Sequence, residues 1–166
     1  MLELDPESPL LLPLDGRAAH AEAIDTLLSW AQRSIGIFDN DLSEPGWSSP
    51  LRAELLTRFF QRSPQARLEI FLREPGRFHT ALPRLAALWR LRTHALSIHQ
   101  VGEDALGLFD PFLIVDQRHY WHRFHFEQAR GEIGVCQPEY ANQLLRRLQE
   151  IREVSGPATA VTVLGL

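Results

Sequence analysis

The sequence predicts a single α/β domain in which a mixed β-sheet is flanked by helices on both faces. First, its 166 residues, of which 45% are hydrophobic, suit one sizeable core. Second, the run 112–115 is wholly apolar and is followed by the carboxylate of Asp116, which is typical of a strand buried on both faces. Third, strand-like and helical segments alternate before this run. The run itself belongs to a strand meander, and a helix follows the meander.

Three prolines and a glycine interrupt the first 16 residues. We therefore expect residues 1–16 to form an irregular N-terminal arm with at most one short edge strand, and residues 17–166 to form the domain. Apolar spacing and turn residues predict helices over 17–34, 50–63 and from the turn at 74–76 to about 92, and strands over 34–38, 66–72 and 95–100. Pro83 is expected to delay the third helix or to kink it.

The second half of the chain is expected to form an antiparallel meander over residues 107–136, followed by a helix. The apolar strand 112–115 turns at Gln117-Arg118 into an alternating strand over 119–127. We expect Gly131 to break this strand, and a further short strand to follow over 133–135. Pro138 opens the last helix, and the apolar tail over 160–164 could add one edge strand.

Composition excludes several kinds of chemistry. The formal net charge of −4 argues against a surface that coats nucleic acid. All 17 basic residues are arginines, so neither a Schiff-base lysine nor a P-loop lysine is available. The lone Cys136 excludes an internal disulfide framework and a cysteine-based zinc cluster. Because Pro13 interrupts the leucines at 10–12, no membrane span is predicted, and the cytoplasm is the expected location.

The order of elements and the central strand together resemble the phospholipase D-like fold. Catalytic members of that family carry the motif H-x-K-x-x-x-x-D on the strand that here ends at Asp116. Counting back from Asp116, the histidine position is Phe109 and the lysine position is Pro111, so only the aspartate matches. The segment 123–127 lacks the Gly-Ser pattern that usually follows. The resemblance covers about residues 17–155, and it implies a degenerate domain similar to bacterial phospholipase D-like domains without an established activity.

Polar residues follow two of the predicted strands. Asp39 and Asp41 come directly after the strand 34–38, and Arg73 follows the strand 66–72. Ligands of open α/β sheets bind at the carboxyl ends of the strands, so we expect these residues to line a crevice, together with Arg123. The two carboxylates could hold a cation or act in acid–base chemistry. The alternative, that they only stabilise a turn, is favoured.

Three histidines alternate along the predicted strand 119–127. At ~3.3 Å per residue, His119 and His125 lie about 20 Å apart and His122 points to the other face, so no metal site is predicted. Arg123, between them, could bind an anion. The arginines at positions 77, 84, 90 and 92 are interpreted as a solvated helix face, and a nucleic-acid partner is not favoured. No cofactor is predicted.

These observations lead to two hypotheses of different classes. The first is a non-catalytic phospholipase D-like binding or assembly module, whose ligand the sequence does not identify. The second is an enzyme acting on phosphate-containing substrates through a rebuilt site of Asp39, Asp41, His119 and Arg123. Clustering of these four residues would favour the enzyme, and dispersal would favour the module. The resemblance implies that single-motif catalytic relatives pair two chains to complete one site, which suggests a homodimer here.

Overall fold

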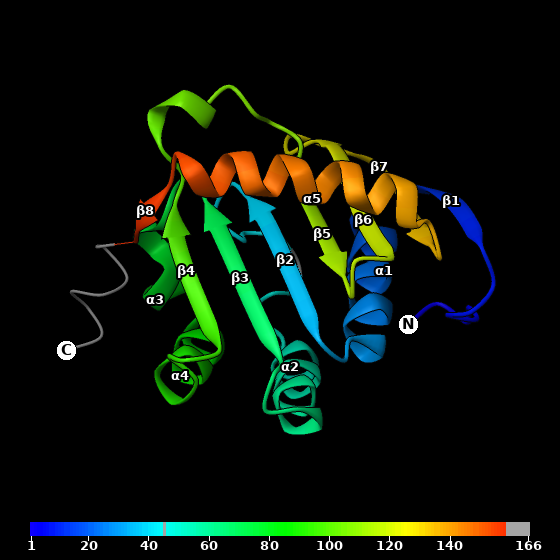
Figure 1. Ribbon diagram of the computed structural model, residues 1–166, viewed down its shortest axis with the longest axis horizontal. Coiled ribbons are helices and arrows are strands. Elements are labelled where there is room, and N and C mark those ends of the chain that lie inside the picture. The colour runs from blue at the N-terminus through cyan, green and yellow to red at the C-terminus, as the bar shows by residue number, and fades with distance from the viewer. Residues whose placement is uncertain (45, 159–166) are drawn as a thin grey trace.

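The computed structural model describes residues 1–44 and 46–158 (Figure 1). Within these ranges the chain forms one eight-stranded sheet with the order β1-β7-β6-β5-β2-β3-β4-β8. The strands are β1 (Leu10–Asp15), β2 (Ser34–Asp39), β3 (Arg67–Leu72), β4 (Leu96–Gln100), β5 (Phe112–Val115), β6 (His119–His125), β7 (Gln128–Val135) and β8 (Gly156–Pro157). Strands β2, β3 and β4 are mutually parallel, and the other neighbours are antiparallel. The predicted mixed sheet is therefore confirmed.

Helices flank this sheet on both faces, as predicted. The described helices are α1 (Arg17–Trp30), α2 (Pro50–Arg62), α3 (Phe78–Ala81), α4 (Pro83–Leu91) and α5 (Pro138–Glu153), with short 3-10 turns η1 (Pro75–Arg77) and η2 (Glu103–Ala105). Helices α1, α2 and α4 cover one face, and α5 crosses the other near the carboxyl ends of β2, β3 and β4 (Figure 1). Among the described helices, none combines the length and the apolar character needed to cross a membrane.

Each face of the sheet has its own apolar core because successive strand residues point to opposite faces. On the side of α1, α2 and α4, Ile35 and Ile37 of β2 belong to the larger core. On the side of α5, Phe38, Phe71 and Phe112 from three adjacent strands belong to the smaller core. The central strands are thus buried on both faces, as the apolar run 112–115 predicts.

Some boundaries differ from the sequence-based predictions. Gly131 does not break a strand but lies inside β7, where a Cβ would lie 2.2 Å from the carbonyl oxygen of His122. The glycine therefore permits a close approach of two strands. The predicted third helix is divided at Pro83 into α3 and α4. Helix α1 ends at Trp30, and the predicted tail strand over 160–164 lies outside the described residues.

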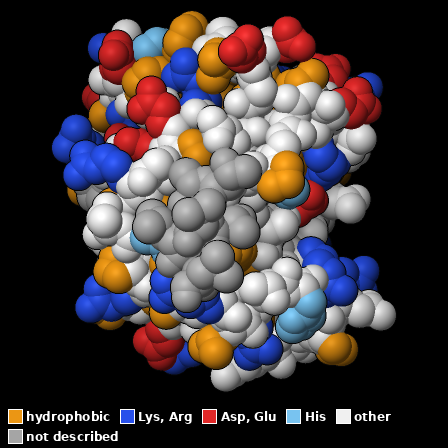
Figure 2. Space-filling model, turned by 90° about the vertical axis from the view of Figure 1, so that its left-hand side faces the viewer, with side chains coloured by type: hydrophobic (Ala, Val, Ile, Leu, Met, Phe, Trp, Pro, Cys, Tyr) orange, Lys and Arg blue, Asp and Glu red, His pale blue; other side chains and the backbone are white. Residues whose placement is uncertain are grey.

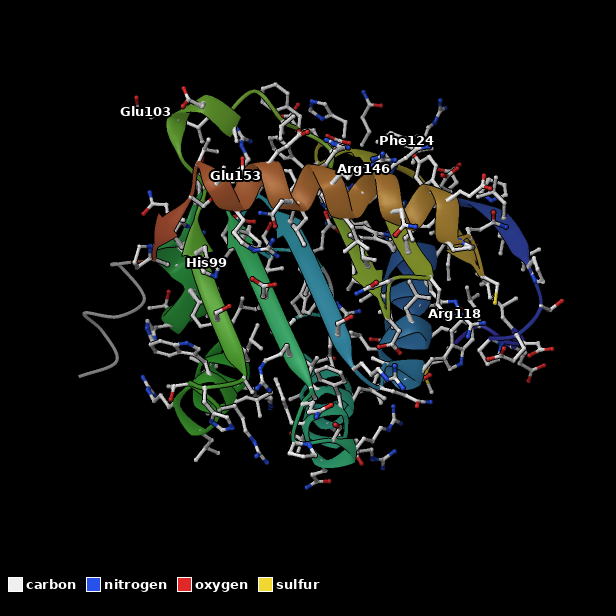
Figure 3. All side chains as sticks on the ribbon, viewed as in Figure 1. His99, Glu103, Arg118, Phe124, Arg146 and Glu153 are labelled. Atoms are coloured by element: carbon white, nitrogen blue, oxygen red, sulfur yellow. The ribbon has the colours of Figure 1, made fainter. Side chains whose placement is uncertain are left out.

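The strand directions define two edges of the sheet. We call the side of the sheet where β2 and β3 end, at Asp39 and Leu72, the carboxyl edge. The amino edge is the opposite one, where β2 begins and, because β5 runs antiparallel to β2, where β5 ends at Val115. Figure 3 shows Arg118 at the amino edge, beside the N-terminal segment, and Phe124 towards the carboxyl edge.

Candidate functional site

The carboxyl edge brings together two of the residues predicted to line a crevice. The backbone N–H of Arg73 donates to the carbonyl oxygen of Asp39 at 3.1 Å. The guanidinium of Arg73 also donates to Oδ1 of Asn40 at 3.1 Å and to the carbonyl oxygen of Leu106 at 2.8 Å. Because parallel strands β2 and β3 end side by side, the residues that follow them are neighbours, as expected.

Asp39 is a buried carboxyl group with one free oxygen. Its side chain is only 3% exposed. Oδ1 accepts the N–H of Asn40 at 2.6 Å, whereas Oδ2 has no partner among the described residues. Burial raises the pKa of Asp39 to about 7, and the nearby carboxylates of Asp41 and Glu44 act in the same direction. This group can therefore exchange a proton near neutral pH.

Arg123 lies in the same region but is fully engaged within the protein. Its side chain is buried, and its guanidinium forms an ion pair with Glu44. Nε donates to the carbonyl oxygen of Gln128 at 2.6 Å, and the backbone N–H donates to the carbonyl of Pro111 at 2.9 Å. A buried arginine with these partners holds β6 and the loop after β2 together, and an anionic ligand would have to displace Glu44 to reach it.

Asp41 has the local contacts of a turn residue. Its Oδ1 accepts the N–H of Ser43 at 3.0 Å, two residues further along the chain. The intervening Leu42 has a φ of +59°, in the left-handed region. Asp41 and Glu44 also line a pocket of about 200 Å³ that includes Arg77. The turn interpretation therefore has direct support in the hydrogen bonding.

The two motif positions, Phe109 and Pro111, also lie at the carboxyl edge. The ring of Phe109 stacks on the imidazole of His125, with 5.6 Å between the ring centroids. The guanidinium of Arg73 lies 4.8 Å above the ring of Phe109 and 5.4 Å from that of Phe126. Pro111 is buried immediately before β5. The motif position Phe109 thus lies beside Arg73, one of the residues predicted to line a crevice.

A polar network beside this edge is not evident from the sequence. Both carboxylate oxygens of Asp110 accept hydrogen bonds from Arg147 of α5, at 2.6 and 2.8 Å. Oδ2 of Asp110 also lies 2.8 Å from Nε2 of His122, whose Nδ1 lies 3.1 Å from the Tyr140 hydroxyl. Burial alone would raise the pKa of Asp110, but the hydrogen bonds from Arg147 and His122 outweigh it and hold that pKa below its ordinary value. Nothing in the spacing of these residues links them.

His119 does not join the other predicted site residues. It lies opposite Val115, which in turn lies opposite Ile35. Asp39 is four residues further along β2, roughly 13 Å away along the strand direction at ~3.3 Å per residue. Nδ1 of His119 instead accepts the backbone N–H of Cys136 at 3.1 Å. The expectation of one site containing Asp39, Asp41, His119 and Arg123 is therefore corrected, because β6 carries His119 at the amino edge.

Asp116, the matching residue of the motif, has a structural role at the amino edge. Its carboxylate accepts the backbone N–H groups of Gln32, Arg33 and Ser34 at 2.8–3.0 Å. These bonds hold the connection between α1 and β2 against the end of β5. Asp116 has a φ of +51°, which Asp and Asn tolerate better than most residues.

The arginines of the third predicted helix have separate local contacts. Arg84 donates to the carbonyl of Ser48 at 2.9 Å, and Arg92 lies 6.0 Å from the ring of Phe60. Figure 2 shows the side of the molecule near α3, α4 and β8, where basic side chains are scattered around the rim rather than joined in one band. Within residues 1–44 and 46–158, no group of three or more His, Cys, Asp or Glu side chains is arranged to hold a metal ion.

The fold is similar to solved structures of the phospholipase D family. Nuc from Salmonella typhimurium, a phospholipase D family member, matches with a TM-score of 0.64 and 15% identity, over 90% of this chain and 98% of that one. NucT from Helicobacter pylori matches with a TM-score of 0.53 and 11% identity, over the same shares of the two chains. TrmBL2, an archaeal chromatin protein with a novel mode of DNA binding, matches with a TM-score of 0.64 and 14% identity, over 93% of this chain and 57% of that one.

These likenesses show that the domain has a phospholipase D-like fold. No curated protein sequence matches the chain. The family model described as "Domain of unknown function (DUF7931)" matches residues 16–164, which is most of the sequence. The chain therefore belongs to the DUF7931 family.

Proposed function

We propose that the chain is a non-catalytic phospholipase D-like module that associates with a second copy of itself. The observation that carries the proposal is the identity of the residues at the two motif positions. Phe109 and Pro111 stand where the resemblance places the histidine nucleophile and the phosphate-binding lysine. Neither side chain can attack phosphorus or donate a hydrogen bond to a phosphate oxygen.

The cationic groups near these positions support the absence of catalysis. Arg73 donates to Asn40 and Leu106, and Arg123 pairs with Glu44. A phosphate that bound Arg123 would therefore have to displace Glu44 and leave a largely buried carboxylate unpaired. An arginine also approaches phosphate as a rigid fork, so it does not simply substitute for a lysine.

The same edge offers a surface for association. We name the aromatic edge for Phe109, His125 and Phe126, whose rings contact one another, and for the exposed Leu106 and Phe124, which are close to them in sequence. Phe109 is 43% exposed and Phe124 is 53% exposed, which is unusual for rings of this size. Exposed apolar groups that lie together mark interaction sites more often than isolated ones do. A two-fold contact through this edge would cover both rings in each copy.

The proposed absence of catalysis can be tested by assaying hydrolysis of bis(p-nitrophenyl) phosphate and of phospholipid at high protein concentration. We expect no turnover above the buffer blank, and no difference between the wild type and His125→Ala. Turnover that survives extensive purification and disappears in His125→Ala would overturn the proposal, because His125 is the imidazole that stacks on Phe109.

One observation favours the second hypothesis, an enzyme acting on phosphate-containing substrates. The imidazole of His125 and the guanidinium of Arg73 both lie against the ring of Phe109, so a potential nucleophile and a cation meet at the motif position. His125, rather than His119, would then be the nucleophile. The hydrolysis assay distinguishes the two functions directly.

A further inference from the structure

A large pocket lies at the amino edge, away from the aromatic edge. It has a volume of about 730 Å³, which is in the range of small-molecule sites. Its walls come from the N-terminal arm, the end of α1, the end of α2 and the turn between β5 and β6. The residues that line it include Glu7, Trp30, Arg33, Arg62, Arg118 and His119. We name this cavity the amino-edge pocket.

The two carboxylates of the amino-edge pocket are already satisfied. Asp116 accepts three backbone N–H groups from the connection between α1 and β2. Glu7 accepts a hydrogen bond from Nη2 of Arg118 at 3.0 Å. With these two acids engaged, three arginines face them in the same cavity, which leaves an excess of positive charge.

Several hydrogen-bond donors of the pocket have no partner. The guanidinium of Arg33 makes no hydrogen bond or ion pair with any described residue. Arg62 uses Nη1 on the carbonyl of Ala31, and Arg118 uses only Nη2, on Glu7, Pro6 and Cys136. The remaining N–H groups of these two arginines are without partners among the described residues.

His119 adds a neutral donor to the wall of the pocket. The side chain is buried, at 4% exposure. Because Nδ1 accepts the N–H of Cys136, the proton of the neutral ring is on Nε2, which has no partner among the described residues. Burial, and then the charge of Arg118, lowers the pKa of His119 below its ordinary value, so the ring is neutral at pH 7.

Trp30 supplies an aromatic wall. It is half-buried at the end of α1, and its ring lies 5.4 Å from that of His119. Guanidinium groups bind oxyanions with two parallel hydrogen bonds, and an indole ring offers a flat surface for stacking. A ligand that uses both features has an oxyanion and a planar ring.

We propose that the amino-edge pocket binds a small molecule that combines a phosphate or carboxylate group with a planar ring. Arg33, Arg62 and Arg118 hold the oxyanion, Nε2–H of His119 donates to it, and the ring lies on Trp30. The carboxylate of Glu7 competes with the ligand for Arg118. The site is independent of the proposed association at the carboxyl edge, because the two lie at opposite ends of β2.

The test is isothermal titration of the full chain with phenyl phosphate, benzoate and inorganic phosphate at constant ionic strength. We expect saturable binding of a ring-bearing anion, tighter than that of inorganic phosphate. The stronger of phenyl phosphate and benzoate identifies the oxyanion as phosphate or carboxylate. Arg33→Gln with Arg62→Gln should weaken binding about tenfold or more, as the loss of charge-assisted hydrogen bonds requires. Glu7→Gln should strengthen it.

Two further variants make the result specific. Trp30→Leu should remove the advantage of the ring-bearing anion while inorganic phosphate still binds. Arg146→Gln on α5 is the matched control, because this exposed arginine lies outside the pocket (Figure 3). Unchanged affinity in the folded Arg33→Gln, Arg62→Gln double variant would overturn the proposal. The same conclusion would follow if no anion bound saturably at millimolar concentration, or if Arg146→Gln weakened binding equally.

Discussion

The indole N–H of Trp121 donates to Nδ1 of His20 at 2.7 Å, which joins strand β6 to helix α1 within the core. Both side chains are buried, at 1% and 2% exposure. The bond requires a neutral imidazole whose proton is on Nε2, and that atom has no partner among the described residues. A charged His20 would have to lose this hydrogen bond or move.

This relationship predicts a loss of stability in acid. Burial lowers the pKa of His20 below its ordinary value of 6.5, so the unfolded chain binds the proton more tightly than the folded protein does. The contribution of His20 to the free energy of unfolding is complete above pH 6.5 and is lost as the pH falls through 6.5 towards the folded pKa. In His20→Asn, urea denaturation at pH 8 and pH 5 should show a smaller difference than in the wild type. An equal difference would contradict the assignment.

The buried carboxyl group of Asp39 should make the stability depend on pH in the opposite direction. Its folded pKa of about 7 lies above the ordinary value of 3.8, so the folded protein binds the proton more tightly. Stability from this group is present below pH 3.8 and is lost as the pH rises to 7, by about 4 kcal/mol for a shift of this size. Asp39→Asn keeps the acceptor for Asn40 and should be more stable than the wild type at pH 8, by roughly 2–4 kcal/mol. The two proteins should have the same unfolding free energy at pH 3.

Asp116 is expected to matter for folding. Asp116→Ala removes the acceptor of three backbone N–H groups and places alanine at a φ of +51°, so it should lower the free energy of unfolding by about 2 kcal/mol. Asp116→Asn keeps an acceptor oxygen and tolerates the same backbone conformation, so its cost should be smaller. Chemical denaturation measures both, with the exposed Asp104→Ala as the control. Equal stability of the wild type and Asp116→Ala would refute the role.

A buried ion pair joins α1 to α2. Nε of Arg52 donates to Oδ1 of Asp25 at 2.8 Å, the arginine side chain is fully buried, and Trp47 lies 4.6 Å from its guanidinium. Asp25→Ala leaves that charge without its partner and should destabilise the protein by about 3–5 kcal/mol. The double variant Asp25→Ala with Arg52→Met should recover much of this loss, since no buried charge remains. A double variant less stable than Asp25→Ala would argue against this account.

Self-association through the aromatic edge is measured by light scattering at tens of micromolar. We expect the wild type to exceed the monomer mass of 19.0 kDa, and Phe109→Ser with Phe124→Ser to restore that mass. Leu91→Ser is the control, because Leu91 is 77% exposed on α4 and lies outside the aromatic edge. Only the 19.0 kDa species in the wild type would rule out the dimer.

The residues at the carboxyl edge could be predicted from sequence because their positions depend only on the neighbouring residues in the chain. Asp39 and Arg73 each follow an apolar strand, and parallel neighbours end together. The position of His119 could not be predicted in the same way. It depends on the direction of β5 relative to β2, which the apolar run 112–115 leaves undetermined because both of its faces are buried.

Contacts between residues that are far apart in the sequence could not be predicted either. The pairing of Arg123 with Glu44, and of Asp110 with Arg147, joins segments that only the complete sheet brings together. Gly131 shows a related ambiguity, since a glycine can interrupt a strand or permit two strands to approach closely. Only the position of the His122 carbonyl decides between these roles.

The pairing of β1 with β7 has a consequence for how the chain folds. Leu10 lies opposite Val135, so β1 is synthesised long before the strand with which it pairs. During translation, the parallel strands β2, β3 and β4 can assemble with their helices while residues 10–15 have nothing to pair with. Closing so long a loop is slow, because the chain loses conformational entropy before contacts between the two strands compensate for that loss. Although β1 precedes the other seven described strands in the sequence, it is therefore among the last of them to enter the sheet.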